Sequence, residues 1–540
     1  MKNVKQKYNE VPNVSNIKDL VKYGVDKGPD KKFVIYHNEN NDECIKTFRN
    51  TWDDISKIGT FIFKHNLRNC KIALLGENSY EWIVIFFSIF LGQNVFVPLD
   101  RELPAEDLAE QLILSGCKAL FYSEKYKGSA EIIKSNIEMP VEQYLSIEDF
   151  DLFRAEGEYA LKEKYFDFID KDVKSSDLAC IVFTSGTTGK SKGVMLTHGN
   201  LVADVTATCM CVSAQHTVLF LPFNHTFAWI SLFAAFIFNE NGYLCKDYRN
   251  VVKDFQKYHP QHFMAVPLVI EKIYNTIWRT AEKTGQTSTL RKGIKINRFL
   301  LKLGINKGSK LFKKIHEQLG GNLELIICGG AALDLRYEEE LYHMGIVVLN
   351  GYGITECSPV VTVNRVENFK LGSIGLPLPC NEVKIFEPDE NGIGEIFVRG
   401  SNVMIGYYND PEATENAFDG EWFKTGDYGR IDKDGFLYFV GRKKNLIILA
   451  NGKNISPEEL EDKLIKIPYV REVIVYEEKK RIVAEFYLNE EDYPDARQKL
   501  NIDVHDLNRS LPMSKHIGKI KVREIEFPKT TTLKIKRRYN

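Results

Sequence analysis

The chain has 540 residues, of which 44% are hydrophobic and 27% charged, and its formal net charge is -1. This length allows two or more domains, and the composition excludes a disordered, collagen-like or low-complexity chain. The balance of 72 Lys and Arg against 73 Asp and Glu gives no overall attraction to polyanions. We therefore expect a globular protein that does not bind nucleic acid.

Cysteine usage and hydropathy bear on the compartment. The ten cysteines form no CxxC pair and no Cys/His cluster at zinc-ligand spacing, which favours reduced thiols in a cytoplasmic protein. The N-terminus lacks the apolar core of a signal peptide. The most apolar stretch, 82–99, is interrupted by Ser88 and Gly92 and falls short of a membrane span. We find no clear amphipathic anchor, and we expect a soluble or loosely peripheral protein.

The first regular elements predict a β-α-β unit. Lys71–Leu75 is typical of a buried strand, Tyr80–Leu91 of a helix, and Val95–Val97 of the next strand. Further strands are predicted at 179–183, 218–221, 263–266, 325–328 and 346–349. Because these strands alternate with helical patterns, we expect a largely parallel α/β core with ligands at the carboxyl ends of its strands.

The pattern changes after about residue 380. Short strands are predicted at 394–398 and 435–440, and a small mixed region begins near Gly441. One helix start there is well specified, with Ser456 as cap, Pro457 in the first helical position and Glu459 completing a capping box. We expect a large domain at 1–440 and a small domain at 441–540.

The final segment is basic. Residues 511–540 include nine Lys and Arg against two Asp and Glu, a net charge of +7. Such a run is a solvated tail unless it meets a polyanion such as ATP.

Residues 183–194, FTSGTTGKSKGV, combine glycines, hydroxyls and lysines after a predicted strand. Glycines let backbone amides approach an anion, while hydroxyls and lysines bind phosphate oxygens. A Walker A loop does not fit, because Thr184 stands where its first glycine is required. The alternatives are another kind of phosphate loop and a hydroxyl-rich surface turn.

Other segments offer groups that suit a nucleotide. In 350–356, NGYGITE, Tyr352 has a face for a base, Thr355 has a hydroxyl for phosphate, and Glu356 has hard oxygens for Mg²⁺. In 422–427, WFKTGD, the Asp427 carboxylate can accept two hydrogen bonds from a diol. Taken singly, these segments are also compatible with tight turns.

These segments resemble, in the same order, motifs of the adenylate-forming superfamily, which includes acyl-CoA synthetases, adenylation domains and luciferases. The glycine turn at 328–332, the GRKK run at 441–444 and the segment 527–537 extend the resemblance over about residues 45–540. The resemblance implies an α/β fold: a large domain of parallel and mixed sheets flanked by helices, with a small β-barrel-like subdomain. It also implies a small, mobile α+β C-terminal domain that carries the catalytic lysine.

The resemblance implies roles for individual residues. The catalytic residues would be Lys534, Thr184, Lys192, Glu356 and His225, with Thr184 and Glu356 as Mg²⁺ ligands and Lys444 as the hinge. The nucleotide would contact Thr184, Ser185, Gly186, Thr187, Thr188, Gly189, Lys192, Gly329, Gly330, Ala331, Gly351, Tyr352, Gly353, Thr355, Asp427, Arg442 and Lys534.

Two positions depart from the family pattern. Ser191 replaces a usual proline, and Leu533 replaces the glycine that usually precedes the catalytic lysine. Since leucine adopts positive φ less readily than glycine, Lys529 and Lys536 are rivals to Lys534.

The resemblance implies that a carboxylate attacks MgATP to give acyl-AMP and pyrophosphate, and that the CoA thiol then forms a thioester. In 221–229, LPFNHTFAW, His225 would lie beside the carboxylate and Trp229 would gate an acyl tunnel, although either residue also suits a core. The segment 266–274 resembles long-chain members, so we expect medium-to-long fatty acids, selected by about 0.8 kcal/mol per buried CH₂.

The alternatives are loading of a carrier-protein phosphopantetheine, a non-catalytic acyl or nucleotide sensor, and a P-loop NTPase. The missing first glycine argues against the P-loop NTPase. No insertion typical of fatty-acid-AMP ligases is present between Gly394 and Gly441, which favours CoA.

Overall fold

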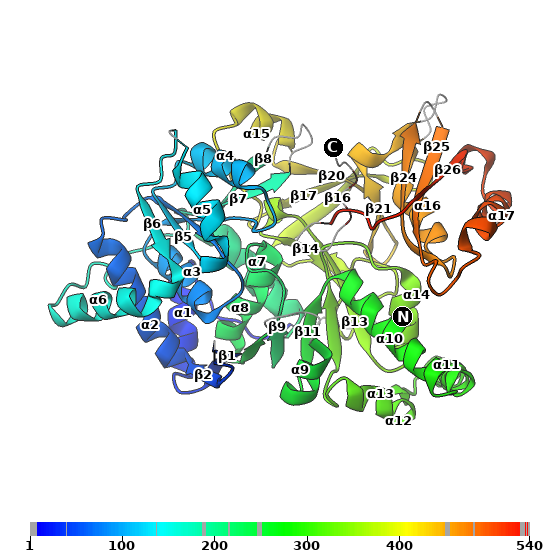
Figure 1. Cartoon of the computed structure of the whole chain (residues 1–540), viewed down its shortest axis with the longest axis horizontal. Helices are drawn as coiled ribbons and strands as arrows, with labels where there is room; N and C mark the ends of the chain where they lie inside the picture. The colour runs from blue at the N-terminus through cyan, green and yellow to red at the C-terminus, as the bar shows by residue number, and fades with distance from the viewer. Residues whose placement is uncertain are drawn as a thin grey trace. The chain divides into compact units, whose positions relative to one another are not determined.

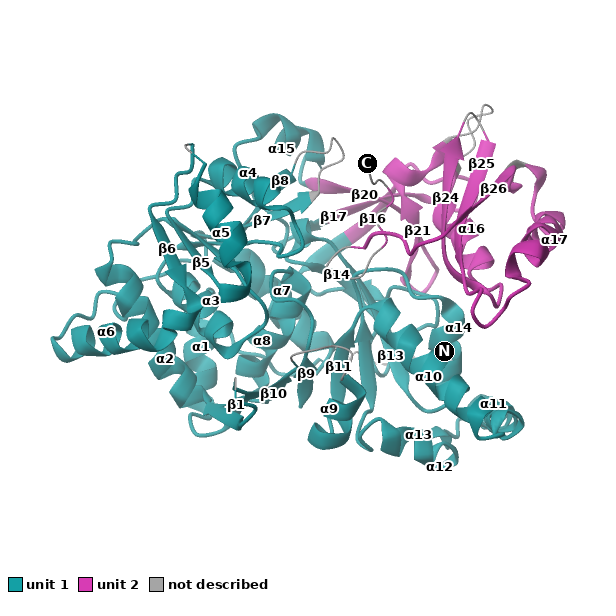
Figure 2. Cartoon of the chain, viewed as in Figure 1, with its two compact units in different colours: residues 1–382, 399–421 teal, residues 383–398, 422–540 magenta. Residues whose placement is uncertain are grey.

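The computed structural model describes residues 8–38, 40–136, 138–185, 191–213, 216–245, 251–448, 454–478 and 481–529, with 535 and 537. It consists of a larger unit, 1–382 with 399–421, and a smaller unit, 383–398 with 422–540 (Figure 2). The predicted α/β class is confirmed. All ten cysteines are free thiols. The functional boundary at residue 440 stays a prediction.

One sheet of the larger unit has nine strands, parallel from β1 to β13 and antiparallel at both edges. In spatial order they are β15 (Leu376–Pro377), β14 (Val360–Val363), β13 (Val347–Gly353), β12 (Leu325–Cys328), β11 (His262–Ala265), β9 (Thr217–Leu219), β10 (Gly242–Leu244), β1 (Lys32–His37) and β2 (Glu43–Thr47). Because the central strands are parallel, the segments that follow them meet at one edge of the sheet.

A second sheet of the larger unit has seven strands. In spatial order they are β18 (Gly406–Tyr407), β8 (Ser191–Thr197), β7 (Leu178–Ser185), β4 (Val95–Pro98), β3 (Lys71–Leu75), β5 (Ala119–Tyr122) and β6 (Gln143–Ser146). The predicted β-α-β unit is β3, α3 (Tyr80–Leu91) and β4. Ser79 begins α3 by accepting a hydrogen bond from the backbone N–H of Trp82.

Helices pack against these sheets (Figure 1). They are α1 (Ile17–Lys27), α2 (Phe48–Lys64), α4 (Ala105–Ser115), α5 (Lys127–Lys134), α6 (Phe150–Lys162), α7 (His198–Cys211), α8 (Thr226–Phe238), α9 (Val251–Tyr258), α10 (Pro267–Lys283), α11 (Thr287–Lys302), α12 (Gly308–Leu311), α13 (Lys313–Gln318), α14 (Leu335–His343) and α15 (Pro411–Ala417), followed by the short strand β19 (Phe418–Asp419). The core between α3, β4 and α8 is aromatic, with the Phe86 ring 5.1 Å from Phe96 and 5.3 Å from Trp229. This cluster fixes the start of α8 beside β9.

The described residues of the smaller unit contribute to two larger sheets and form one two-stranded sheet. An antiparallel sheet includes β16 (Asn381–Phe386), β17 (Gly394–Gly400), β20 (Trp422–Ile431) and β21 (Leu437–Arg442). The other has β24 (Val470–Glu478), β25 (Arg481–Leu488) and β26 (Lys519–Arg523), accompanied by α16 (Pro457–Leu464), α17 (Ala496–Arg509) and the short pair β22 (Ile447–Ile448) and β23 (Asn454–Ile455). The predicted cap of α16 forms, since Ser456 accepts from the N–H of Glu459. The predicted capping box is wrong, because the Glu459 carboxylate pairs with Lys463 and Lys515 and does not reach back to the Ser456 backbone.

Candidate active site

The predicted phosphate loop joins two antiparallel strands. Thr184 at the end of β7 pairs with Lys192 at the start of β8, so both residues lie at the same end of the hairpin. The backbone of Ser185 pairs with that of Ser191. Gly186, Thr187, Thr188 and Gly189 lie outside the described residues, as does the side chain of Ser185.

Lys192 and Glu356 both contact one tyrosine. The Lys192 Nζ lies 4.9 Å from the centre of the Tyr407 ring, and the Tyr407 hydroxyl donates to Glu356 Oε1 at 3.0 Å. Tyr407 lies on β18, which pairs with β8. Burial and the Glu356 charge raise the pKa of Tyr407 well above its ordinary value, so the hydroxyl keeps its proton. Three residues distant in sequence thus meet beside the hairpin.

Tyr407 was missed by the sequence reasoning. The segment 406–411, GYYNDP, begins with a glycine and offers two adjacent tyrosines, and nothing local distinguishes them. The antiparallel pairing of β18 with β8 selects Tyr407, because it places that residue opposite Val194. A pairing between segments that are more than 200 residues apart carries no signal in a single sequence.

Glu356 lies in a 3₁₀ turn, η4 (Thr355–Cys357), immediately after β13. The preceding Gly353 approaches the chain so closely that a Cβ there would lie 2.1 Å from the carbonyl oxygen of Pro359. The backbone oxygen of Glu356 accepts from the N–H of Met404 at 2.8 Å. Gly351 and Tyr352 lie on β13, and Tyr352 is buried. Close backbone packing therefore fixes the turn that carries Glu356 and Thr355.

A buried polar network, which we call the Asp204 hub, anchors this turn. Asp204 Oδ1 on α7 accepts from the N–H of Val360 and from Asn402 Nδ2, each at 3.0 Å. Asn402 Nδ2 also lies 2.9 Å from the carbonyl oxygen of Cys357. Burial raises the pKa of Asp204 well above its ordinary value, although the hydrogen bonds from Asn402 and Val360 oppose this shift. The hub thus ties α7 to the chain that follows Glu356.

The second glycine turn follows β12. The N–H of Gly329 donates to the carbonyl oxygen of Ala265 at 3.1 Å, and a Cβ at Gly329 would lie 2.8 Å from the ring of Phe227. Gly330 has φ +85, a conformation that favours glycine. Ala331 is exposed. Because β12 and β13 are adjacent parallel strands, this turn and the Glu356 segment lie at the same sheet edge.

A second buried carboxyl supports this edge from α14. Glu338 Oε2 accepts a hydrogen bond from the N–H of Gly372 at 2.9 Å, and Glu338 has no exposed surface. Burial raises the pKa of Glu338 to about 7. The group is therefore neutral below this pH and holds the loop before β15.

The predicted acyl-site residues lie at the start of α8. Asn224 Nδ2 is 3.4 Å from His225 Nε2. The Trp229 indole N–H donates to the carbonyl oxygen of Phe223 at 2.7 Å, and Trp229 is 1% exposed. A cavity of about 10 Å³ lies between this segment, β9 and Met264 of β11. Trp229 thus belongs to the aromatic core here, and its gating role stays a prediction.

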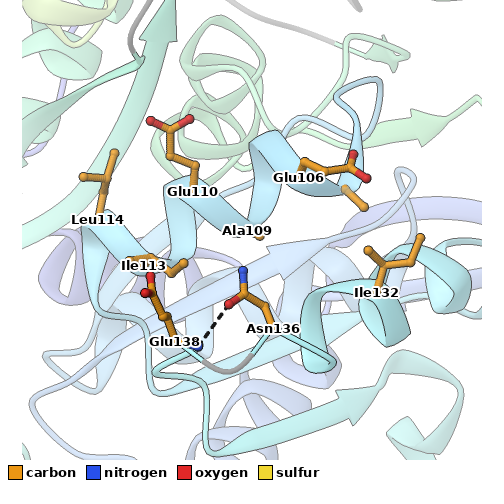
Figure 3. A pocket seen from close by; sticks show the side chains of 9 residues that line it. Glu106, Ala109, Glu110, Ile113, Leu114, Ile132, Asn136 and Glu138 are labelled. Atoms are coloured by element: carbon orange, nitrogen blue, oxygen red, sulfur yellow. Dashed lines mark hydrogen bonds between the residues drawn. The ribbon is translucent and has the colours of Figure 1, made fainter.

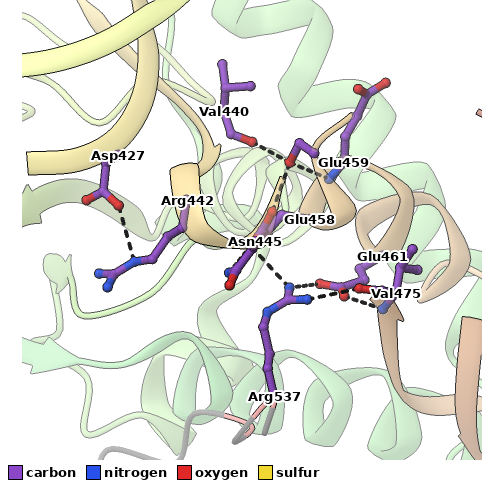
Figure 4. Close-up of polar contacts among 10 residues, drawn as sticks. Asp427, Val440, Arg442, Asn445, Glu458, Glu459, Glu461, Val475 and Arg537 are labelled. Atoms are coloured by element: carbon purple, nitrogen blue, oxygen red, sulfur yellow. Dashed lines mark hydrogen bonds and ion pairs between the residues drawn. The ribbon is translucent and has the colours of Figure 1, made fainter. Parts of the chain in front are cut away.

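In the smaller unit, Asp427 on β20 pairs across the strands with Arg442 on β21. Asp427 Oδ1 lies 3.2 Å from Arg442 Nε (Figure 4), with side-chain exposures of 1% and 44%. Lys444 lies in the following 3₁₀ turn, η5 (Lys443–Asn445). The buried carboxylate beside a half-exposed guanidinium suits a diol, and the ribose and hinge roles of these residues stay predictions.

Lys534 lies outside the described residues, as does its rival Lys536. The described residues on either side are held by ion pairs. Lys529 Nζ lies 2.5 Å from Glu472 Oε1 on β24, and Arg537 pairs with Glu458 and Glu461 on α16 (Figure 4). The other rival, Lys529, is therefore already engaged by a carboxylate.

A hollow of about 350 Å³ lies between α4 and α5 (Figure 3). Its lining is Ala105, Glu106, Ala109, Glu110, Ile113, Leu114, Ile132, Asn136 and Glu138. None of these residues was predicted for the site. The three glutamates would repel a triphosphate, so this hollow is not suited to ATP.

In the described part of the chain, no three His, Cys, Asp or Glu residues are grouped to hold a metal ion by themselves. No helix among the described residues is both long and apolar enough to cross a bilayer.

Comparison with known proteins places this geometry in a family. Residues 21–408 match the family model described as AMP-binding enzyme. The chain is 27% identical over 523 residues to the long-chain-fatty-acid–CoA ligase FadD15 of Mycobacterium bovis, covering 87% of this chain and 85% of that protein. It is 28% identical over 483 residues to human long-chain-fatty-acid–CoA ligase 6, covering 80% and 67%.

A solved structure agrees over most of the chain. O-succinylbenzoate coenzyme A synthetase (MenE) from Bacillus subtilis, in complex with ATP and magnesium ion, aligns with a TM-score of 0.73 and 26% identity, covering 96% of this chain and 98% of that one. The family match covers the hairpin, the Glu356 turn and Tyr407 together. The chain belongs to the AMP-binding enzyme family.

Proposed function

We propose that the chain activates a medium-to-long-chain fatty acid with ATP and transfers the acyl group to CoA. The main support for this proposal is that one hairpin and its neighbours bring together a hydroxyl, a cation and a carboxylate. These groups belong to Thr184, Lys192, Tyr407 and Glu356. The long-chain-fatty-acid–CoA ligases among the relatives supply the substrate class. The ten free thiols support a cytoplasmic location.

Mg²⁺ fits the residues present. It usually binds one or two protein oxygens and completes its shell with phosphates and water, so it needs no protein cluster of three ligands. The Glu356 carboxylate and the Thr184 hydroxyl are the proposed protein donors. Bound Mg²⁺ would offset negative charge on the phosphates.

The first step forms a mixed anhydride. A carboxylate oxygen of the acid attacks the α-phosphorus of ATP, the bond to the bridging oxygen breaks, and pyrophosphate leaves. The acid is already an anion, so the protein need not remove a proton. Its task is to position two anions and to stabilise the charge at phosphorus, for which we propose Lys192 and Lys534.

Tyr407 would position these groups. Its protonated hydroxyl holds one oxygen of Glu356, while its ring lies against Lys192. Both side chains thereby lose rotational freedom before ATP binds, which lowers the cost of ordering them.

The second step forms the thioester. The sulfur of CoA attacks the acyl carbon, the bond to the AMP phosphate oxygen breaks, and AMP leaves while the thiol proton passes to solvent. Asp427 and Arg442 are the proposed ribose contacts throughout, and His225 the residue beside the acyl carboxylate.

The test is a panel of acids from C2 to C18, with aryl acids, incubated with MgATP with and without CoA. We expect AMP, pyrophosphate and a CoA thioester, with an optimum among medium or long chains. Pyrophosphate release without CoA turnover would move the acceptor to a carrier protein. Failure of every acid to release pyrophosphate would refute the proposal.

A further inference from the structure

Residues 283–314 form the most cationic stretch of the larger unit. They include ten Lys and Arg and no Asp or Glu, in a chain with a net charge of -1. The structure folds this stretch into α11, α12 and the start of α13, and all ten basic residues are exposed. Figure 1 shows α11 beside α10 at the periphery of this unit.

One side of α11 carries a row of exposed apolar side chains. Ile296, Phe299 and Leu303, the last at the helix cap, are 52%, 63% and 60% exposed. Their spacing of three and four residues places them on one side of the helix. Large apolar side chains grouped on a surface indicate an interaction site.

The orientation of α11 is fixed by its opposite side. Leu290 and Asn297 are buried there, and Asn297 Nδ2 donates to the carbonyl oxygen of His343 at 2.8 Å. Asn297 Oδ1 also accepts from the N–H of Lys307 at 2.9 Å. These two hydrogen bonds prevent the helix from rolling its apolar row inward.

Lysines flank the row. Lys292, Lys295 and Lys302 are exposed, and none forms an ion pair with another residue that the structure describes. By contrast, Arg298 lies 3.3 Å from Glu339. We call the six residues Lys292, Lys295, Ile296, Phe299, Lys302 and Leu303 the α11 patch.

We propose that the α11 patch docks the protein on an anionic lipid surface. The apolar row would enter the boundary between headgroups and acyl chains, while the lysines would bind lipid phosphates and carboxylates. Lipid is favoured over an acidic protein because three large apolar side chains protrude among the cations. Docking needs neither ATP nor CoA, so it stands apart from the catalytic proposal.

The first experiment is co-sedimentation of the full chain with vesicles. Binding is expected to vesicles that contain phosphatidylserine, to be weak with phosphatidylcholine alone, and to fall at about 0.5 M salt. Binding that depends neither on lipid charge nor on salt concentration would overturn the proposal. So would failure to bind lipid together with binding to an acidic carrier protein.

The second experiment separates the apolar row from other exposed apolar residues. The double variant Phe299→Ser with Leu303→Ser should lower the partition coefficient by about tenfold. The matched control is Leu152→Ser with Tyr159→Ser on α6, where both residues are similarly exposed, at 57% and 61%. All four side chains are exposed, so folding should persist. If both double variants lowered the partition coefficient equally, or if neither lowered it, the assignment would be contradicted.

The third experiment tests the cations. Replacing Lys292, Lys295 and Lys302 together by Gln should weaken binding to anionic vesicles by about tenfold or more and flatten its salt dependence. An unchanged salt dependence would assign the attraction to other charges and overturn the patch.

Discussion

The two units hold their candidate site residues by different physical means. In the larger unit, buried carboxyls hold the sheet edge that carries the Glu356 turn, with Asp204 in its hub beside the turn and Glu338 at Gly372 in the loop before β15. In the smaller unit, the segments around Lys534 are held by ion pairs, including Arg537 with Glu461. Buried hydrogen-bond networks are rigid and little affected by salt, whereas partly exposed ion pairs exchange partners readily. The first arrangement suits a preformed nucleotide site, and the second suits a segment that must be released.

The largest expected effect concerns Lys534. Lys534→Ala should slow adenylate formation by about a thousandfold, because a positioned cation at phosphorus is lost, while thioester formation from supplied acyl-AMP should persist. Rapid-quench assays of the two half-reactions measure this. Lys529→Ala and Lys536→Ala are the matched controls. Equal loss in both half-reactions, or a larger loss in Lys529→Ala, would remove Lys534 from its role.

The Asp204 hub should dominate the stability of the larger unit. Asn402→Ala removes the donor shared by Asp204 and the Cys357 carbonyl, leaving buried acceptors unpaired, so the free energy of unfolding should fall by about 3 kcal/mol. Denaturant unfolding measures the loss. A variant as stable as the parent would mean that the hub contributes little.

Variants at Glu356 and Tyr407 should separate the effect of the carboxylate charge from the effect of side-chain positioning. Glu356→Gln keeps an acceptor for Tyr407 but removes the charge, so kcat should fall by about a hundredfold and the Mg²⁺ requirement should rise. Tyr407→Phe should lower kcat by about tenfold, with less change in the Mg²⁺ requirement. Steady-state kinetics across Mg²⁺ concentrations distinguish them. If Tyr407→Phe changed stability but not kcat, the tyrosine would be only structural.

The raised pKa of Glu338 predicts that the free energy of unfolding depends on pH. Its folded pKa of about 7 exceeds the ordinary value of 4.5, so its contribution is fully present below 4.5 and is lost as the pH rises through 7. Glu338→Gln stays neutral and can still accept from Gly372. Relative to this variant, the parent should lose about 2 kcal/mol between pH 5 and pH 8. Parallel stability curves in that interval would refute the neutral carboxyl.

The smallest effect should come from the ion pairs of the smaller unit. Arg537→Gln should destabilise the attachment of the terminal segment to α16 by about 1 kcal/mol, and high salt should reduce the difference between parent and variant. Limited proteolysis of the C-terminal segment at two salt concentrations measures this. Equal cleavage of parent and variant would remove Arg537 as an anchor.

Local patterns predicted much of the fold. The helix 80–91 and the strand 325–328 have the predicted bounds, because dense apolar runs mark them. The strand predicted at 346–349 extends to Gly353, since β13 leaves its parallel partner β12 and continues beside β14. That second pairing depends on a distant segment, which apolar periodicity does not register.

The candidate site divides in the same way. Motif resemblance selected Thr184, Lys192 and Glu356 from short local runs. Tyr407 and the Asp204 hub depend on contacts across more than 50 residues, so they emerge only from the fold. The outward face of α11 was also missed. This helix has apolar residues on two sides, and the hydrogen bond of the buried Asn297 decides which side faces inward.

Attack of the acid on the α-phosphorus of ATP can be followed with a long-chain fatty acid that carries ¹⁸O in its carboxylate and with mass analysis of the products. One labelled oxygen should appear in AMP when the thioester forms, with none in pyrophosphate. Label in inorganic phosphate, or unlabelled AMP alongside the thioester, would contradict it.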